Sequence, residues 1–173
     1  MRRIKVAAVA LNQTPLDWRA NVDHIRGALG HARDAGVDVV CLPELCISGY
    51  GVEDFFLSEG VLERAWGHLI ALLPETQGVM TCLGLPVAHR GKRYNAVAVV
   101  CDGALIALVC KRFLAGDGLH YEPRWFDPWP VGQVETYAAD GLEVPIGDCY
   151  VDCGGVRVGV EICRDAWVDG RPA

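Results

Sequence analysis

The sequence lacks a run of apolar residues long enough to cross a membrane, which takes about 20 consecutive, mostly apolar residues. The first apolar segment, residues 6–11, is too short for the core of a secretory signal, and it alternates as a strand does. These absences argue against a membrane partner and against secretion. We therefore expect a cytoplasmic protein in a reducing compartment.

Clusters of basic residues are also scarce. The chain carries a net charge of -6, and its one tight basic group consists of Arg2, Arg3 and Lys5. A protein that follows a nucleic-acid backbone needs a patch of lysine and arginine to neutralise the phosphates. We therefore expect no nucleic-acid partner.

The 8 cysteines lack the spacing of a metal site. No pair is separated by two residues, and no histidine is placed to complete a zinc-binding set. We therefore expect no metal, and without a secretory signal a disulfide framework is disfavoured. Four of the cysteines lie within runs of valine, leucine and alanine, where core packing is expected: Cys41, Cys82, Cys101 and Cys110.

The composition is typical of one packed domain. The chain has 173 residues, of which 51% are hydrophobic and 22% charged, so it can bury a core. Strand-like and helix-like segments alternate in its first half, with strands at 4–11, 37–42 and 79–85 and helices at 17–35 and 58–73. Asp17 and Ser58 are the expected N-caps, and Gly36 and Pro74 follow the helix ends.

Two hairpins are expected in the second half. Asp102-Gly103 joins strands at 95–101 and 104–110, and Gly154-Gly155 joins strands at 149–153 and 156–162. Residues 114–148 are rich in glycine, proline and aromatics and show little periodicity. We expect this segment to be a long functional loop.

The pattern predicts an α/β layered domain, but the layers it predicts are incomplete. Little more than residues 167–173 follows the last expected strand, so nothing remains to cover the second face of a sheet. We therefore expect the N-terminal part of a larger domain, or a domain that a partner completes.

Three polar residues follow strand-like apolar runs. They are Glu44, Lys111 and Cys163. Taken singly, they are better explained as a loop glutamate, a surface lysine and a buried thiol, respectively. Functional groups of α/β sheets gather where strands end on one side, so the three together form a coherent set. A carboxylate can take a thiol proton, and an ammonium can stabilise an oxyanion.

A series of motifs along the chain then resembles one family. The stretches are Ala10-Leu11-Asn12-Gln13, Pro43-Glu44-Leu45, Gly49-Tyr50-Gly51, Gly84-Leu85-Pro86-Val87, Arg93-Tyr94-Asn95, Tyr121-Glu122-Pro123-Arg124-Trp125-Phe126, Val144-Pro145-Ile146-Gly147-Asp148 and Gly159-Val160-Glu161-Ile162-Cys163. Their order and spacing resemble the nitrilase, or carbon–nitrogen hydrolase, superfamily. More narrowly, they resemble the N-terminal glutaminase domain of glutamine-dependent NAD synthetases.

The resemblance implies a fold and a set of site residues. The fold would be the N-terminal part of a four-layer αββα sandwich, with residues 1–173 an incomplete domain whose C-terminal part and synthetase domain are missing. Glu44 matches the general base, Lys111 the lysine and Cys163 the nucleophile. Glu122 matches a glutamate that orients the lysine and the amide, and Tyr50 an aromatic of the glutamine pocket.

The resemblance also implies a reaction. The thiolate of Cys163 would attack the carboxamide of glutamine, and Lys111 and the backbone N–H of Arg164 would hold the oxyanion. Ammonia would pass to a synthetase domain that amidates deamido-NAD. ATP and magnesium are implied only for that missing domain, so no cofactor is expected in this segment. The implied partners are glutamine and the missing C-terminal region or a homo-oligomer partner.

One residue departs from the family pattern. Arg164 stands where the NAD-synthetase branch commonly has an acidic residue, and this inverted charge argues against specificity for glutamine. Arg164 is expected to contact the substrate and to lower the pKa of Cys163. The alternatives are a stand-alone amidase that acts on another amide and an inactive truncated fragment. A redox or metal-binding cysteine protein is disfavoured by the cysteine spacing.

Overall fold

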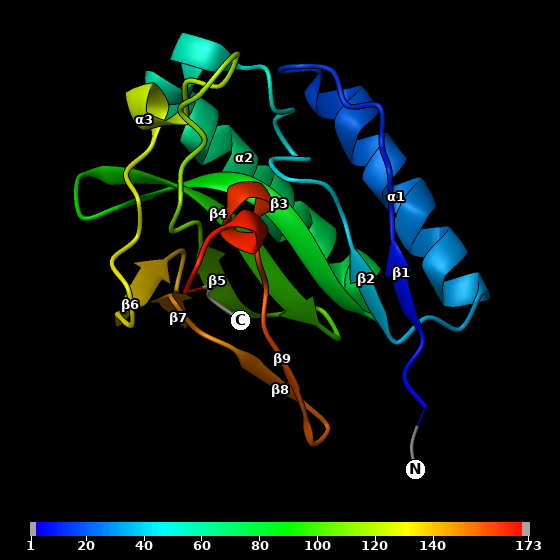
Figure 1. Ribbon diagram of the computed structural model, residues 1–173. Coiled ribbons are helices and arrows are strands. Elements are labelled where there is room, and N and C mark those ends of the chain that lie inside the picture. Colours follow the sequence, from blue (N-terminus) through cyan, green and yellow to red (C-terminus); the bar gives the residue numbers. More distant parts are fainter. Residues whose placement is uncertain (1–2, 171–173) are drawn as a thin grey trace.

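The computed structural model describes residues 3–170, with the side chain of Cys153 excepted. Its main element is a mixed seven-stranded sheet in the order β1-β2-β3-β4-β5-β7-β6. The strands are β1 (Val6–Ala8), β2 (Val39–Cys41), β3 (Met80–His89), β4 (Lys92–Cys101), β5 (Ala104–Cys110), β6 (Val134–Ala139) and β7 (Leu142–Gly147). The expected α/β class is therefore confirmed (Figure 1).

Two helices cover one face of this sheet. They are α1 (Trp18–Asp34) and α2 (Glu59–Leu72), which continues into a 3-10 turn, η2 (Leu73–Thr76). Apolar residues of α1 such as Ile25 pack with Leu83 of β3 and Leu69 of α2 in the largest core cluster. The bounds match the expected helices. Asp17 caps α1 by accepting the N–H of Ala20, but Ser58 makes no side-chain cap bond to α2.

The sheet combines parallel and antiparallel strand pairs. β1, β2 and β3 run parallel, because α1 and α2 provide the crossovers, and β3, β4 and β5 form antiparallel hairpins. Asp102 and Gly103 both have positive φ angles, of 49° and 80°, as a two-residue hairpin turn requires. The predicted first hairpin is confirmed.

The prediction of a long loop at residues 114–148 is wrong for much of that segment. It contains a helical turn, α3 (Glu122–Trp125), and the antiparallel pair β6–β7, of which β7 joins the sheet beside β5. Asp140-Gly141 makes the turn, with φ angles of 51° and 77°. The pair was missed because alternate residues of β6 are only partly buried, which weakens the apolar pattern.

A small hairpin lies on the other face of the sheet. It pairs β8 (Val151–Cys153) with β9 (Val156–Val158), and side chains such as Val158 pack against Val97 and Val109. Figure 1 shows this pair in orange, away from α1 and α2. The described residues thus form a helical layer, the large sheet and this short second layer.

The strand that was expected to end at Cys163 is shorter than predicted. β9 stops at Val158, and Val156 is 38% exposed, so it is not a strand buried on both faces. Strand pairing does not reach Ile162, because its backbone N–H donates to the carboxylate of Asp165. Cys163 instead begins a 3-10 turn, η3 (Cys163–Trp167). In the described residues no helix is long and apolar enough to span a bilayer.

Candidate active site

Lys111 lies at the centre of a buried charged network. Its Nζ donates to Glu44 Oε1 at 2.6 Å and to Glu122 Oε1 at 2.8 Å. The side chain of Lys111 is 0% exposed and that of Glu122 1%, whereas Glu44 keeps 17%. The structure therefore brings Glu44, Lys111 and Glu122 into contact, although Glu44 lies far from the other two in the chain.

Burial and pairing set the charges of this network. Burial alone would lower the pKa of Lys111, but the charges of Glu44 and Glu122 and their hydrogen bonds raise it instead. The lysine is therefore a permanent ammonium at neutral pH. For Glu44, burial raises the pKa and Lys111 opposes that shift. Glu44 is thus a more basic carboxylate than an exposed glutamate.

Close packing fixes the backbone that carries Glu44. The residue follows β2 by a short turn, and that turn lies directly on β3 at Gly84. A Cβ at Gly84 would come within 2.4 Å of the Leu45 nitrogen and 2.6 Å of the Pro43 oxygen, so no larger residue fits. Only a glycine lets the turn approach the strand so closely.

Asn95 of β4 is a member of the network that the sequence did not single out. Its Nδ2 donates to Glu44 Oε1 at 2.6 Å, and its backbone carbonyl accepts from the N–H of Lys111. The side chain is buried, and its Oδ1 has no partner among the described residues. An asparagine inside the apolar run of β4 was the signal that could have identified it.

Glu122 and Tyr50 form the second half of the network. Glu122 Oε2 accepts the backbone N–H of Ala115, and its Oε1 accepts the Tyr50 hydroxyl at 2.7 Å. Burial and the neighbouring Glu122 raise the pKa of Tyr50, so the phenol stays protonated. His120 Nδ1 lies 3.3 Å from the same hydroxyl and is a further residue that the sequence did not indicate.

Cys163 lies in a pocket of about 470 Å³ next to this network. Ala115 and His120, which contact the Glu122 and Tyr50 side chains, also line the pocket with Cys163 and Arg164. The thiol is exposed, and its backbone has a φ of 49°, a left-handed conformation that is strained for a residue other than glycine. Such strain is common at functional sites.

The pKa of Cys163 is raised, not lowered as the sequence had suggested. Partial burial of the thiol is the largest cause, the charges of Glu44 and Glu122 add to it, and Lys111 and the backbone N–H of Arg164 oppose it. The expected effect of the Arg164 charge is absent from these causes. The guanidinium instead pairs with Asp117, Nη1 to Oδ1, at 2.6 Å. The thiol therefore needs a base to become nucleophilic.

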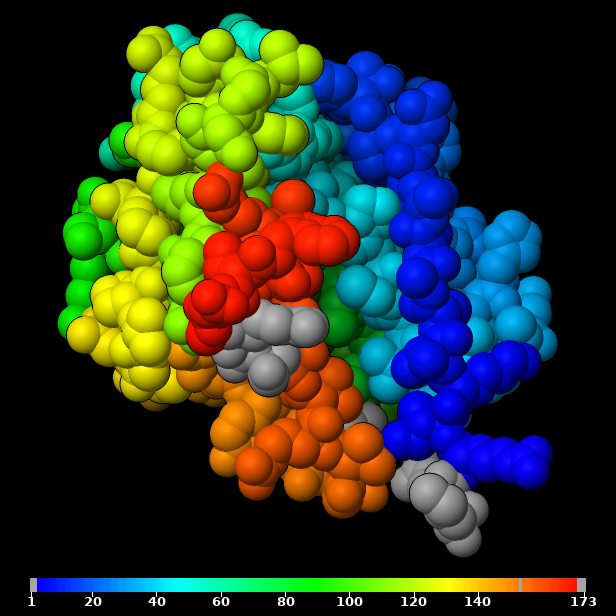
Figure 2. Space-filling view, in the orientation of Figure 1, coloured from blue at the N-terminus to red at the C-terminus, as the bar shows by residue number. Residues whose placement is uncertain are grey.

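Asp165 holds the Cys163 segment in place. Its buried carboxylate accepts the backbone N–H groups of Phe113 at 2.8 Å and of Arg112 and Ile162 at 3.2 Å each. These bonds tie η3 to the residues that directly follow Lys111. Figure 2 shows the red segment of η3 against the yellow-green segment that follows β5. The sequence did not identify this carboxylate as important, because no local pattern shows that it bonds backbone groups far away in the chain.

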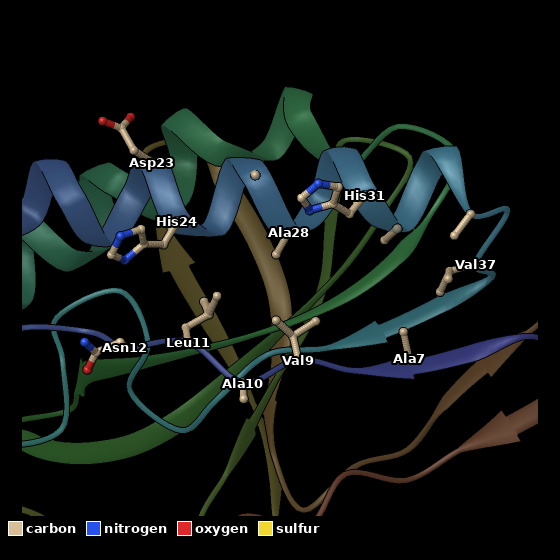
Figure 3. A pocket seen from close by; sticks show the side chains of 13 residues that line it. Ala7, Val9, Ala10, Leu11, Asn12, Asp23, His24, Ala28, His31 and Val37 are labelled. Carbon is tan, nitrogen blue, oxygen red and sulfur yellow. The ribbon is translucent and has the colours of Figure 1, made fainter.

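Further hollows lie beside the network or away from it. One, of about 690 Å³, is lined by Tyr50, His120, Arg124 and Trp125, and it shares His120 with the Cys163 pocket. Another is a groove of about 590 Å³ between α1 and residues 7–12. Figure 3 shows His24, His31 and Leu11 along it. None of the six predicted site residues lines that groove.

Comparisons with known proteins agree on one family. The carbon-nitrogen hydrolase family model matches residues 5–171. The glutamine-dependent NAD(+) synthetase of Bos taurus is 32% identical over 99% of this chain, which covers 26% of that protein. The synthetase of Arabidopsis thaliana is 32% identical over 95% of this chain, which covers 24% of it. The chain thus spans about a quarter of these curated relatives.

Solved structures give the same result. A glutamine-dependent NAD(+) synthetase from Cytophaga hutchinsonii superposes with a TM-score of 0.88 and 39% identity over 90% of this chain and 27% of its own. An amidase from Nesterenkonia sp. shares the fold, with a TM-score of 0.63 and 20% identity over 82% of this chain and 54% of its own. The chain therefore belongs to the carbon-nitrogen hydrolase family.

Proposed function

We propose that this chain carries the glutamine amidohydrolase site of a glutamine-dependent NAD synthetase, with Glu44 as base, Cys163 as nucleophile and Lys111 as oxyanion donor. The observation that supports it best is the buried Lys111 ammonium between Glu44 and Glu122, beside the pocket that contains Cys163. The 39% identity to the Cytophaga hutchinsonii synthetase and the similarity to curated synthetases support the narrower assignment.

The charges of the site fit the first step of this reaction. Cys163 is a neutral thiol and Glu44 a basic carboxylate, since burial raises the pKa of each group. Glu44 takes the thiol proton as the sulfur attacks the carboxamide carbon. Lys111 cannot serve as the base, because its raised pKa keeps it protonated. Its ammonium and the backbone N–H of Arg164 stabilise the oxyanion.

The remaining steps release ammonia and glutamate and restore the starting protonation states of Glu44 and Cys163. Glu44 gives its proton to the leaving nitrogen, so ammonia departs and a thioester to Cys163 remains. Water then attacks the thioester with Glu44 again as base. Collapse of the second tetrahedral intermediate releases glutamate, and the proton on Glu44 returns to the sulfur.

The Arg164–Asp117 pair suits an amino-acid substrate. Both residues line the Cys163 pocket, and their side chains are 40% and 76% exposed. In our proposal the guanidinium contacts the α-carboxylate of glutamine and Asp117 contacts its α-ammonium. An uncharged amide would offer neither charge a partner beyond the Arg164–Asp117 pair itself, so glutamine would be preferred.

The proposed use of the released ammonia rests on the similarity of the chain to NAD synthetases. We infer that the ammonia amidates deamido-NAD at a synthetase site outside these residues, where ATP and magnesium would act. We also infer that residues 1–173 form the first part of a four-layer αββα sandwich, completed by further chain or by a second copy. A cytoplasmic location remains part of this proposal.

The test is glutamine hydrolysis by the protein and its variants. We expect ammonia release with glutamine, loss of turnover in Cys163→Ala, and an unchanged far-UV spectrum in that variant. Cys149→Ala, at a cysteine outside the site, is the matched control and should retain turnover. Turnover in Cys163→Ala would refute the assignment.

A panel of simple amides separates the two enzymatic functions. Faster hydrolysis of an uncharged amide than of glutamine would favour a stand-alone amidase, which has the support of the Nesterenkonia fold match alone. A folded protein that is inactive on every amide would favour a fragment without activity of its own.

A further inference from the structure

His120 lies on the border between two hollows beside the proposed site. It lines both the pocket of about 470 Å³ that contains Cys163 and the hollow of about 690 Å³ that contains Tyr50. The residue is exposed, and its imidazole ring meets the Tyr50 ring edge to face, with the ring centres 6.2 Å apart. No step of the proposed reaction uses this ring.

Hydrogen bonding fixes which nitrogen of the ring carries the hydrogen. The Tyr50 hydroxyl has one hydrogen, and it donates that hydrogen to Glu122 Oε1 at 2.7 Å, because a carboxylate can only accept. The contact of 3.3 Å between His120 Nδ1 and the Tyr50 oxygen therefore requires Nδ1 to be the donor. In a neutral imidazole with its hydrogen on Nδ1, the other nitrogen, Nε2, is an acceptor.

The acceptor nitrogen of His120 is directed away from Tyr50. Nδ1 and Nε2 lie on different edges of the ring, and the Nδ1 edge is held by Tyr50, which lines only the larger of the two hollows. The Nε2 edge is therefore the one that the Cys163 pocket can use. Among the described residues, Nε2 has no hydrogen-bond partner.

The turn that carries His120 also carries Asp117. The backbone N–H of His120 donates to the Asp117 carbonyl at 3.1 Å, and Gly118 between them has a φ of 64°. Asp117 lines the Cys163 pocket too, and one of its carboxylate oxygens already accepts from Arg164 at 2.6 Å. An ammonium group has three N–H donors. A carboxylate that is shared with a guanidinium leaves room for a second acceptor on the same turn.

We propose that His120 determines specificity for a free α-amino group, with Nε2 accepting one N–H of the substrate's α-ammonium beside Asp117. This inference rests on the proposed hydrolysis of glutamine and narrows the substrate class to amides with a free α-ammonium. The bond from Nδ1 to Tyr50 orients the ring, so Nε2 is held in place before the substrate arrives. An amide without the amine leaves Nε2 without its partner and is rejected.

A pair of substrates tests this proposal. Glutaramate is glutamine without its α-amino group, so it keeps the amide and the carboxylate. His120→Asn places an amide N–H where Nδ1 lies, which keeps the bond to Tyr50, but it has no atom in the place of Nε2. In this variant we expect kcat/KM for glutamine to fall at least about tenfold, the effect of one lost hydrogen bond to a charged group. The value of kcat/KM for glutaramate should not change.

His120→Gln is the matched control, because its side-chain oxygen can reach the place of Nε2, and it should keep the preference for glutamine over glutaramate. Equal losses with both substrates in His120→Asn, no loss with either, or the same lost preference in His120→Gln would overturn the inference and leave the proposed hydrolysis standing. Glutaramate hydrolysed as fast as glutamine by the unaltered protein would also overturn it. Ammonia release from neither substrate would refute the proposed hydrolysis as well.

Discussion

At the scale of single residues, the site depends on a lysine that is charged although it is buried. Removing one partner of a buried ion pair leaves an uncompensated charge, at a cost of about 3–5 kcal/mol. Lys111 avoids this with two carboxylates, and Glu44 in turn has a second donor in Asn95. The pKa of the proposed base is therefore adjusted by an uncharged side chain.

Asn95→Ala tests that adjustment. The amide donates to the Glu44 carboxylate and so lowers its pKa, and without it the pKa of Glu44 rises further. The base must be ionised, so kcat/KM for glutamine falls as the pH drops through that pKa. We expect the acid limb to move up by about 0.5–1 pH unit, the equivalent of one hydrogen bond.

The matched control is Asn21→Ala, which removes a buried asparagine bonded to Thr14, away from the network. It should leave the acid limb where it is. An unchanged limb in Asn95→Ala, measured by a pH series of initial rates, would mean that Glu44 is not the group that titrates.

At the scale of elements, short segments bring the site together. η3 is bound to the residues after β5 through the Asp165 carboxylate, and the turn with Glu44 lies on β3 at Gly84. Each contact fixes a segment that carries or adjoins a site residue, so its loss should affect both stability and catalysis.

Asp165→Ala should loosen η3. Three backbone N–H groups lose their acceptor, and we expect the free energy of unfolding to fall by about 3 kcal/mol. Turnover should fall about 100-fold, because the Cys163 sulfur is no longer held against the amide. Chemical denaturation and steady-state rates check both values. Asp169→Ala, at an exposed carboxylate of the same segment, should change neither.

Gly84→Ala should displace the Glu44 turn. The added methyl would lie 2.4 Å from a backbone nitrogen, so β3 and the turn must separate. We expect a loss of at least about 2 kcal/mol in stability together with reduced turnover. Gly30→Ala, within α1, meets no atom within 4 Å and should add about 0.5–1 kcal/mol. Equal effects of the two changes on thermal melting would contradict the packing described for Gly84.

Local signals explain which elements could be predicted from the sequence. The signals for the Asp17 cap, the apolar face of α1 and the Asp102-Gly103 turn each come from residues that are close together in the chain. The β6–β7 pair was missed, although Asp140-Gly141 gives the same turn signal. The end of β9 could not be predicted, since it depends on a bond from Ile162 to a side chain of η3.

At the scale of the whole molecule, the site is assembled from segments that the chain separates widely. Contact between Glu44 and Lys111 followed from where their strands end, but the roles of Asn95 and Asp165 depend on tertiary contacts that no local pattern reveals. The proposed function rests on this convergence, which brings Cys163 beside the proposed base Glu44 and the ammonium of Lys111.

Mass spectrometry after treatment with a glutamine-mimicking diazo-ketone tests that claim most directly. The account predicts one adduct, on Cys163 in peptide 158–164, and much slower labelling in Glu44→Gln. Equal labelling of several cysteines, or labelling of Cys163 at the same rate in Glu44→Gln, would contradict it.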